Sequence, residues 1–361
     1  MKLSVPFLIL QPINSSNLLD TFGMQIHFPA EWEPQSAIQF TFPHKNTDWV
    51  ENLDAASKCF AECITHVTRY QKALVVCANK TETQKILSEA RQNNLILVQI
   101  PSDDTWARDH GPITVIQNGK IVLNDFIFNG WGGKYPADQD NRITQKLFSK
   151  NIFNTDFIQH HHFVLEGGGI ETDGQGTLLT TSSCLLSPER NPTLNKKEIE
   201  AKLKKWLGVH RILWLNHGHL IGDDTDGHID TLARFCSPNS IAYVRCDNPT
   251  DPHFEELKKM ETELKAFKTV NGQPYQLIPL PWPDPCFDRH QNRLPATYAN
   301  FLIINQAVLV PMYNVPQDKA ALKVLQACFP DRKIIGINCR PLIEQHGSLH
   351  CITMQYPQGA I

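Results

Sequence analysis

Short runs of apolar residues alternate along the sequence with segments in which apolar residues recur every three or four positions. The first pattern is typical of buried strands, and the second is typical of amphipathic helices. Strands are therefore predicted at residues 36–42, 72–77, 95–100, 120–128, 177–181, 211–215, 240–245, 300–311 and 333–337. Helices are predicted at residues 49–70, 80–93, 195–207, 253–267 and 317–328.

A unit of one helix followed by one strand recurs along the chain. It is found at residues 80–100, 195–215 and 317–337. Such recurrence without obvious sequence identity indicates an α/β fold with a structural repeat. Glycine and proline occur singly or within tight motifs, and no low-complexity stretch separates two halves. A single domain is therefore predicted.

Composition excludes several classes of protein. The 361 residues carry a formal net charge of -3, so no electrostatic surface for nucleic acid or an anionic membrane is expected. No apolar stretch approaches the ~20 residues of a membrane-spanning helix. The ten cysteines contain no C-x-x-C pair, which favours reduced thiols and a cytoplasmic location. The short apolar run 5–10 contains a proline and has no cleavage-site pattern, which argues against a signal peptide.

Four polar, glycine-rich stretches follow predicted strands or apolar runs. They are "DDTWARDHGP" (103–112), "FNGWGGKY" (128–135), "LEGGGIETDGQG" (165–176) and "HGHLIGDDTDGHIDT" (217–231). Each one alone is explained by a tight turn, since glycine takes positive φ freely. Together they are rich in carboxylates, which would repel one another unless a cation held them; among these are Asp103, Asp104, Asp109, Glu166, Asp223, Asp224, Asp226 and Asp230. The cation could be a metal ion or an organic ligand.

A zinc hydrolase is one hypothesis for this cation site. His217 and His219 form an H-x-H pair, and His228 follows in the same stretch. An organic guanidinium is the other hypothesis, because this planar cation is best held by carboxylates that accept paired hydrogen bonds. Trp106 and Trp131 would then provide flat faces for the cation.

His228 lies two residues from Asp226 on one side and from Asp230 on the other. If this segment is extended, the three side chains face the same side. A histidine between carboxylates suits general acid and base catalysis, although the same pattern also occurs in purely structural positions. Cys351, directly after His350, is open to the same two interpretations, since most intracellular cysteines are buried and inert.

The motifs "WARDHGP", "FNGWGG", "LEGGGIETDGQGTLLTTSSCLLSPERNP", "DTDGHIDT" and "GSLHCITMQ", in this order, resemble the agmatine deiminase and bacterial-type peptidyl-arginine deiminase family. The resemblance begins near residue 27 and implies the pentein fold, a β/α propeller with pseudo-fivefold repeats around a central active-site channel. It implies catalysis without metal or cofactor. It also predicts a single deiminase domain at residues 27–361. Residues 1–26 are then an N-terminal extension, and disorder is one expectation for this extension.

The resemblance also implies roles for individual residues. Cys351 matches the nucleophile, His228 the general acid and base, and Asp109, Glu166 and Asp230 the carboxylates around the guanidinium. Trp106 and Trp131 match aromatic residues of the channel. The sequence departs from the plant-type pattern before the cysteine, where "QHGSLHC" places His346 and Ser348 at positions of glycine and asparagine.

The function expected from the resemblance is hydrolysis of agmatine to N-carbamoylputrescine and ammonia through a thiouronium on the cysteine. Agmatine has a second cation at its amine, and Asp224 and Asp226 are the predicted partners, with Asp224 preferred. The alternatives are a peptidyl-arginine deiminase, the zinc hydrolase and a binding protein without turnover. The expected partner is a small guanidino substrate, and a homodimer or larger homo-oligomer is kept as an expectation.

Overall fold

The structure, a computed structural model, describes residues 25–361. The interpretations of residues 1–24, as part of an extension or as a signal peptide, lie outside the described residues. The first described residues already belong to a sheet, because β1 (Ile26–His27) pairs with the end of β5 (Ile113–Gln117). All ten cysteines are free. Among residues 25–361, no helix has both the length and the apolar character needed to cross a bilayer.

Five sheets contain the strands of the described residues. Their strand orders are β1-β5-β6-β7, β10-β9-β8, β11-β12-β13, β14-β15-β16 and β17-β2-β3-β4. The remaining strand bounds are β2 (Gln35–Thr41), β3 (Lys72–Cys77), β4 (Leu95–Gln99), β6 (Lys120–Ile127), β7 (Asp156–Val164), β8 (Ile170–Thr172), β9 (Thr177–Thr181), β10 (Arg211–Leu215), β11 (Ala233–Ser237), β12 (Ser240–Val244), β13 (Gln276–Leu280), β14 (Leu302–Ile304), β15 (Ala307–Met312), β16 (Lys333–Asn338) and β17 (Met354–Pro357).

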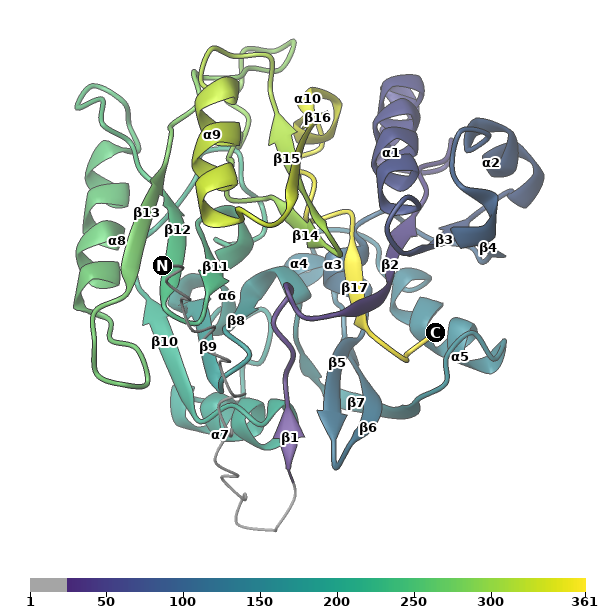
Figure 1. Cartoon of the computed structure of the whole chain (residues 1–361), viewed down its shortest axis with the longest axis horizontal. Helices are drawn as coiled ribbons and strands as arrows, with labels where there is room; N and C mark the ends of the chain where they lie inside the picture. The colour runs from purple at the N-terminus through teal and green to yellow at the C-terminus, as the bar shows by residue number, and fades with distance from the viewer. Residues whose placement is uncertain (1–24) are drawn as a thin grey trace, which may run out of the picture.

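One arrangement of strands recurs in all five sheets. A strand pairs antiparallel with a second strand, and the second strand pairs parallel with a third, as in β14-β15-β16. The parallel step needs a crossover, and helices provide it, because parallel neighbours cannot be joined by a tight turn. Thus α1 (Leu53–Val67) lies between β2 and β3, α8 (Phe254–Ala266) between β12 and β13, and α9 (Asp318–Cys328) between β15 and β16. Figure 1 shows these helices on the outside of the molecule.

The other helices are α2 (Lys80–Ile86), α3 (Ala107–His110), α4 (Gly130–Gly133), α5 (Ile143–Ser149), α6 (Ser182–Leu185), α7 (Lys196–Leu207) and α10 (Arg340–Ile343). The 3-10 turns are η1 (Asp48–Glu51), η2 (Gln92–Asn94), η3 (Asp140–Arg142), η4 (Gly167–Gly169) and η5 (Ile229–Thr231). The largest buried apolar cluster joins β2, β12 and β15 to the inner faces of α1, α8 and α9. Apolar residues at helical spacing therefore define the side of each helix that covers its sheet.

The predicted α/β class is confirmed, and most of the predicted strands lie within a residue of those observed. The strand predicted at 300–311 is wrong. This run forms two antiparallel strands, β14 and β15, and Gln306 in the turn has a φ of 64°. An uninterrupted apolar run hides such a turn, because neither glycine nor proline marks it. The helix predicted at 49–70 is also shorter, since its first residues form η1.

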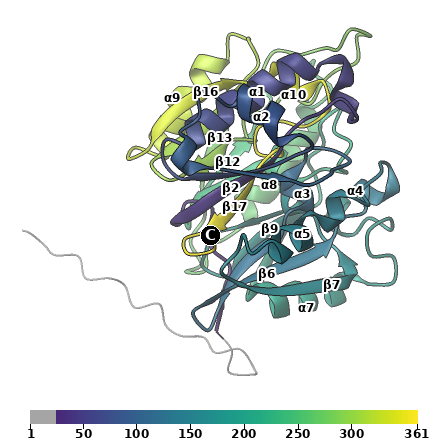
Figure 2. The same ribbon diagram turned by 90° about the vertical axis from the view of Figure 1, so that its right-hand side faces the viewer.

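The strand that follows Cys351 completes the sheet at the other end of the chain. Met354 of β17 pairs with Gln39 of β2, and the two strands run antiparallel. Figure 2 shows β17 beside β2, although more than three hundred residues separate them in sequence. This pairing fixes the position of Cys351, which lies just before β17, relative to the N-terminal sheet.

Candidate active site

The predicted catalytic residues occupy equivalent places in different sheets. Each lies a few residues before the first strand of an antiparallel pair: Asp109 before β5, Glu166 before β8, His228 and Asp230 before β11, and Cys351 before β17. The short elements that carry them are in contact, since α3 packs on η4 and η4 packs on η5. Because every sheet directs this connection to the same region, residues distant in sequence come together.

Cys351 is buried, with 5% of its surface exposed. Its Sγ lies 3.2 Å from the Nδ2 of Asn300 and 3.9 Å from the Oδ2 of Asp230. Burial, and then the charges of Asp230 and Asp109, raise the pKa of the thiol well above its ordinary value. Cys351 is therefore a thiol at neutral pH in the protein without ligand.

Asn300 was not predicted as a site residue. Its Oδ1 accepts hydrogen bonds from the backbone N–H groups of His350, at 2.8 Å, and Cys351, at 3.4 Å. These bonds orient the amide so that its Nδ2 donates to the sulfur. Asn300 lies in "TYANFLII", where the sequence indicates only a buried strand, so nothing in the pattern distinguishes it.

His228 lies between two buried carboxylates. Its Nε2 is 3.5 Å from the Oε2 of Glu166, and its Nδ1 is 3.7 Å from the Oδ1 of Asp109. Burial acts to lower the pKa of His228, but Asp109, Cys184 and Glu166 outweigh it and raise the pKa well above 6.5. The imidazolium form is therefore favoured at neutral pH.

The three predicted carboxylates have different environments. Burial raises the pKa of Asp109 to about 6, with Asp230 and Glu166 adding to the effect, although His228 and the indole N–H of Trp131 act against it. Burial also acts to raise the pKa values of Glu166 and Asp230, but cationic partners overcome it. Both values are lowered, so these two carboxylates are ionised at neutral pH.

A second row of buried charged residues supports the first. His350 contacts Asp230 through Nδ1 and Glu31 through Nε2, at 2.7 Å in each case. Glu31 also contacts Arg234 at 2.9 Å, and the Nε of Arg190 lies 3.1 Å from Glu166. None of these four was predicted. For Arg190, Arg234 and His350 the signal was their place inside or beside the polar motifs, as for His350 in "GSLHC".

Cys351 opens onto a cavity of about 410 Å³. Its lining also includes Asp109 and the predicted aromatic residues Trp106 and Trp131. Asp104 accepts the indole N–H of Trp106 at 2.9 Å and holds that ring in place. The remaining lining residues are Asp48, Tyr135, Asp224, Thr225, Gln345, His346 and Gly347.

His346 and Ser348, the two residues before Cys351 that differ from the plant-type pattern, have different surroundings. His346 lines the cavity, has a φ of 66° and contacts the carbonyl of Gly222 through Nδ1 at 2.8 Å. Ser348 is buried, and its hydroxyl lies 2.9 Å from that of Tyr313. Of the two, only His346 borders the space in which a ligand would lie.

The prediction that Asp226, His228 and Asp230 share one face of an extended segment is wrong. Asp226 has a φ of 67°, and Asp230 lies in the turn η5. Asp226 points away to Lys134, at 2.8 Å, and to Arg190, and it does not line the cavity of Cys351. The glycine at 227 permits the sharp change of direction, which alternation alone does not reveal.

Asp224, the preferred partner for a second cation, does line the cavity. Its Oδ2 accepts a hydrogen bond of 2.8 Å from the hydroxyl of Tyr135. Burial raises the pKa of Asp224 above its ordinary value. Among residues 25–361, the Asp224 carboxylate forms no ion pair, whereas the Asp226 carboxylate is paired with Lys134 and Arg190.

The ligand set of the zinc-hydrolase hypothesis is not brought together. His217 contacts Glu256 of α8 at 3.1 Å, and His219 is exposed. Within residues 25–361, the one group of three possible metal ligands is Glu166, Cys184 and His228, which excludes both. An H-x-H pair places its two imidazoles near each other in sequence but does not bring a third ligand to them.

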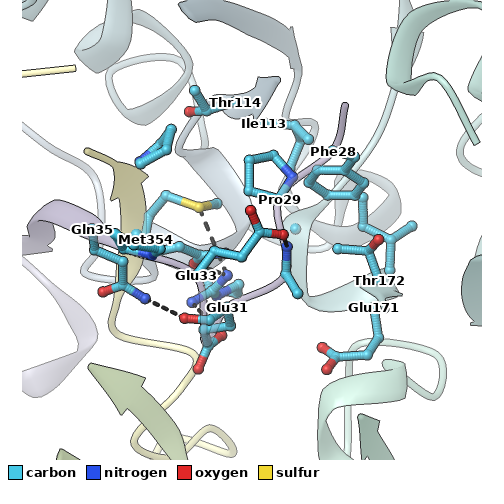
Figure 3. Close-up of a pocket in the computed structure, with 17 residues that line it drawn as sticks. Phe28, Pro29, Glu31, Glu33, Gln35, Ile113, Thr114, Glu171, Thr172 and Met354 are labelled. Carbon is cyan, nitrogen blue, oxygen red and sulfur yellow. Dashed lines mark hydrogen bonds and ion pairs between the residues drawn. The ribbon is translucent and has the colours of Figure 1, made fainter. Parts of the chain in front are cut away.

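A larger cavity, of about 600 Å³, is lined by Glu31 of the second row of charges. Figure 3 shows Glu31 and Glu171 in it, with Phe28, Pro29 and Ile113 forming apolar wall. Neither Cys351 nor His228 lines this cavity. We therefore assign the candidate active site to the smaller cavity, because that one combines a thiol, carboxylates and aromatic faces.

Comparison with known proteins shows the family of this chain. The model of the Porphyromonas-type peptidyl-arginine deiminase family matches residues 27–357. A Vibrio parahaemolyticus protein provisionally named agmatine deiminase is 35% identical, over 92% of this chain and 96% of its own length. The structure of a cysteine-to-serine variant of C. jejuni agmatine deiminase with substrate bound is 37% identical, with a TM-score of 0.89 over 96% of this chain and all of its own.

A provisionally assigned arginine deiminase from Porphyromonas gingivalis is 50% identical, with a TM-score of 0.89 over 93% of this chain and all of its own. The family model spans nearly all of the described residues, and it includes every predicted catalytic residue. This chain belongs to the Porphyromonas-type peptidyl-arginine deiminase family.

Proposed function

We propose that this protein hydrolyses agmatine to N-carbamoylputrescine and ammonia. The observation that carries the proposal is a buried thiol, Cys351, facing a cavity that also presents Asp109, two tryptophans and, farther along, Asp224. A guanidinium fits between the first carboxylate and the aromatic faces. Relatives of this chain that cover almost all of it are named as agmatine deiminases, one of them with substrate bound.

In the proposed reaction, Asp109 and Asp230 hold the guanidinium next to Cys351. The incoming positive charge offsets the two carboxylates that oppose ionisation of the thiol, so the thiol gives its proton to solvent when substrate is present. The thiolate bonds to the guanidinium carbon, and His228, already an imidazolium, gives its proton to the departing ammonia. The C–N bond breaks and a thiouronium remains on Cys351.

Water then completes the cycle. His228, now neutral, takes a proton from the water that attacks the thiouronium carbon. The C–S bond breaks, the hydroxyl proton of the tetrahedral adduct passes to the departing sulfur, Cys351 returns as a thiol and the neutral ureido product leaves. Glu166 lies 3.5 Å from the Nε2 of His228, so it stabilises the imidazolium in both halves of the reaction. No metal or cofactor takes part in these steps.

We infer that the five sheets are the blades of a propeller whose centre is the active site. The support is that all five share one strand pattern and that Asp109, Glu166, Asp230, Asn300 and Cys351 each precede the first strand of a different sheet. Figure 1 shows α3, which carries Asp109, in the middle of the view with sheets on several sides. Residues 27–361 then form one deiminase domain.

Arginine within peptides is the second candidate substrate, because the matching family is named for that activity. The two substrates differ at the far end of the side chain, where agmatine carries an amine and a peptide carries neutral backbone. Asp224 lines the cavity, and among residues 25–361 its carboxylate forms no ion pair, although His346 and Lys134 act to lower its pKa; a carboxylate in this place favours the amine. The cationic amine would sit against this carboxylate and the hydroxyl of Tyr135.

The test is to incubate the purified protein with agmatine, free arginine and a blocked arginine peptide, and to measure the ureido product. We expect kcat/KM for agmatine to exceed that for the peptide at least ~100-fold, equivalent to about 2.7 kcal/mol. Cys351→Ser should lack activity on all three. Asp224→Asn should raise KM for agmatine and leave the peptide rate unchanged. Equal kcat/KM values for agmatine and peptide would overturn the agmatine assignment but not the deiminase chemistry.

A further inference from the structure

A second thiol lies beside His228. Cys184, in α6, is fully buried, and its Sγ is 3.7 Å from the Oε2 of Glu166. The same carboxylate oxygen is 3.5 Å from the Nε2 of His228. The three ligand atoms all lie within 4.8 Å of one another, and no other such trio occurs in residues 25–361. The proposed reaction gives Cys184 no step to perform.

These distances match the edges of a tetrahedral zinc site. With ordinary Zn–S, Zn–N and Zn–O bond lengths, tetrahedral angles place sulfur and oxygen about 3.6 Å apart and nitrogen and oxygen about 3.4 Å apart. The observed values are 3.7 Å and 3.5 Å. Two of the three edges therefore already have the lengths of a tetrahedral site, and the third, between the sulfur and the imidazole, is within 4.8 Å.

The surroundings also suit a divalent cation. Thiolate, imidazole and carboxylate are the three ligand types that zinc takes in proteins. Asp109 lies 3.7 Å from the same imidazole and adds a further negative charge. Arg190 opposes the cation, but its Nε approaches Glu166 at 3.1 Å and 3.2 Å and so remains an anchor for that carboxylate.

We propose that Glu166, Cys184 and His228 form an inhibitory site for Zn²⁺. The ion replaces the thiol proton of Cys184 and the Nε2 proton of His228, and water completes its coordination. Inhibition, but not binding, rests on the proposed function, because the ion occupies the acid-base histidine and its carboxylate. Cys351 is not a ligand, which separates this site from simple capture of the nucleophile by metal.

The test uses Co²⁺ as a spectroscopic substitute, since a cobalt–thiolate bond adds a charge-transfer absorption that an imidazole or carboxylate ligand does not. Cys351→Ser keeps all three proposed ligands and should show this absorption, with one Co²⁺ per chain displaced by Zn²⁺. Cys351→Ser combined with Cys184→Ala should lose it. Cys351→Ser combined with Cys246→Ala is the matched control, because Cys246 is also buried, lies outside the trio and donates through its Sγ to the carbonyl of Asn248.

Turnover provides the second readout. Relative to its own metal-free rate, Cys184→Ala should need at least tenfold more Zn²⁺ for half inhibition than the wild type or Cys246→Ala. Absorption that persists without Cys184, or that is absent whenever Cys351 is replaced, would overturn the site. If the cobalt result holds while no guanidino substrate is turned over, the metal site stands and the proposed function fails.

Discussion

At the scale of single residues, the candidate site opposes the ionised form of Cys351, its proposed nucleophile. Asp230 lies 3.9 Å from the sulfur of Cys351, and burial adds to the cost of a thiolate. The same carboxylates are what a guanidinium needs. The arrangement therefore couples activation of the thiol to the arrival of a cation, and a thiol kept protonated is a poor nucleophile toward other electrophiles.

This coupling predicts the pH dependence of the reaction. The pKa of Cys351 is raised well above 9, that of His228 well above 6.5, and that of Asp109 to about 6. Below pH 6, Asp109 is protonated and loses the cation, and above pH 7 the thiolate fraction still increases with pH. We expect kcat/KM for agmatine to rise from pH 5 to pH 9. A maximum below pH 7 in a steady-state profile would contradict this order of pKa values.

Asn300→Asp tests the hydrogen bond to the sulfur. The substitution keeps the shape, removes the Nδ2 donor that lies 3.2 Å from Sγ and adds a negative charge there. A hydrogen bond to a charged group contributes about 1.5–3 kcal/mol, so kcat/KM should fall at least about tenfold.

A purely structural role would not change the ionisation of the thiol, so alkylation of Cys351 by iodoacetamide is the deciding measurement. In Asn300→Asp its rate should rise only at higher pH than in the wild type. Asn248→Asp, the same change at an exposed loop position, is the control. Identical pH profiles for the two variants would remove Asn300 from the site.

Elements rather than single residues hold His228 in place. The turn η4 brings the backbone of Gly168 against the imidazole, and a Cβ there would lie 2.5 Å from its Nδ1 and 2.9 Å from the Oδ1 of Asp109. The N–H of Gly168 also donates to that same Oδ1 at 3.0 Å. The glycine of "LEGGG" is thus needed for close approach and not for a positive φ.

Gly168→Ala should therefore displace the imidazole and its carboxylate together. A shift of about 1 Å in a catalytic group can cost about 100-fold, and we expect a loss of that order in kcat. Gly336→Ala is the control, since its Cβ would meet only the flexible side chain of Met312, at 3.0 Å. Steady-state kinetics of both variants measure the loss in kcat, and thermal unfolding shows whether either variant is also less stable. An unchanged kcat in Gly168→Ala would show that η4 tolerates the added methyl group.

At the scale of elements, hydrophobic periodicity predicted the strands well where turn residues clearly separate the apolar runs. Residues 72–77, 177–181 and 211–215 coincide with β3, β9 and β10. It failed for the short turns that carry the site, because α3, η4 and η5 are too short to show a period. The motifs contain the predicted residues Asp109, Glu166, His228, Asp230 and Cys351, which the fold brings together. Asn300 lies in a run predicted as a buried strand, and Glu31 lies outside all of these motifs.

At the scale of the whole molecule, β17 joins the last part of the described chain to the first. Tyr356 of this strand is fully buried, and its ring centroid lies 5.0 Å from that of Phe153. Its hydroxyl donates to the side chain of Gln39 in β2. A single side chain thus connects the strand after Cys351 to two other parts of the molecule.

Tyr356→Ala should destabilise the protein by about 3–5 kcal/mol, the usual cost of removing a buried aromatic ring. Tyr356→Phe keeps the ring and loses one hydrogen bond, so its cost should be about 1 kcal/mol. Denaturant unfolding measures both. A result in which the alanine variant is no less stable than the phenylalanine variant would mean that β17 contributes little to the fold.

The pairing of β17 with β2 also orders events during synthesis. A growing chain on the ribosome carries Asp109, Glu166 and His228 well before Cys351 has been added. Until then β2 lacks its antiparallel neighbour, and long-range pairing of this kind forms slowly. On the proposed mechanism, a nascent chain therefore cannot modify guanidino compounds until the segment that carries Cys351 and β17 has been added.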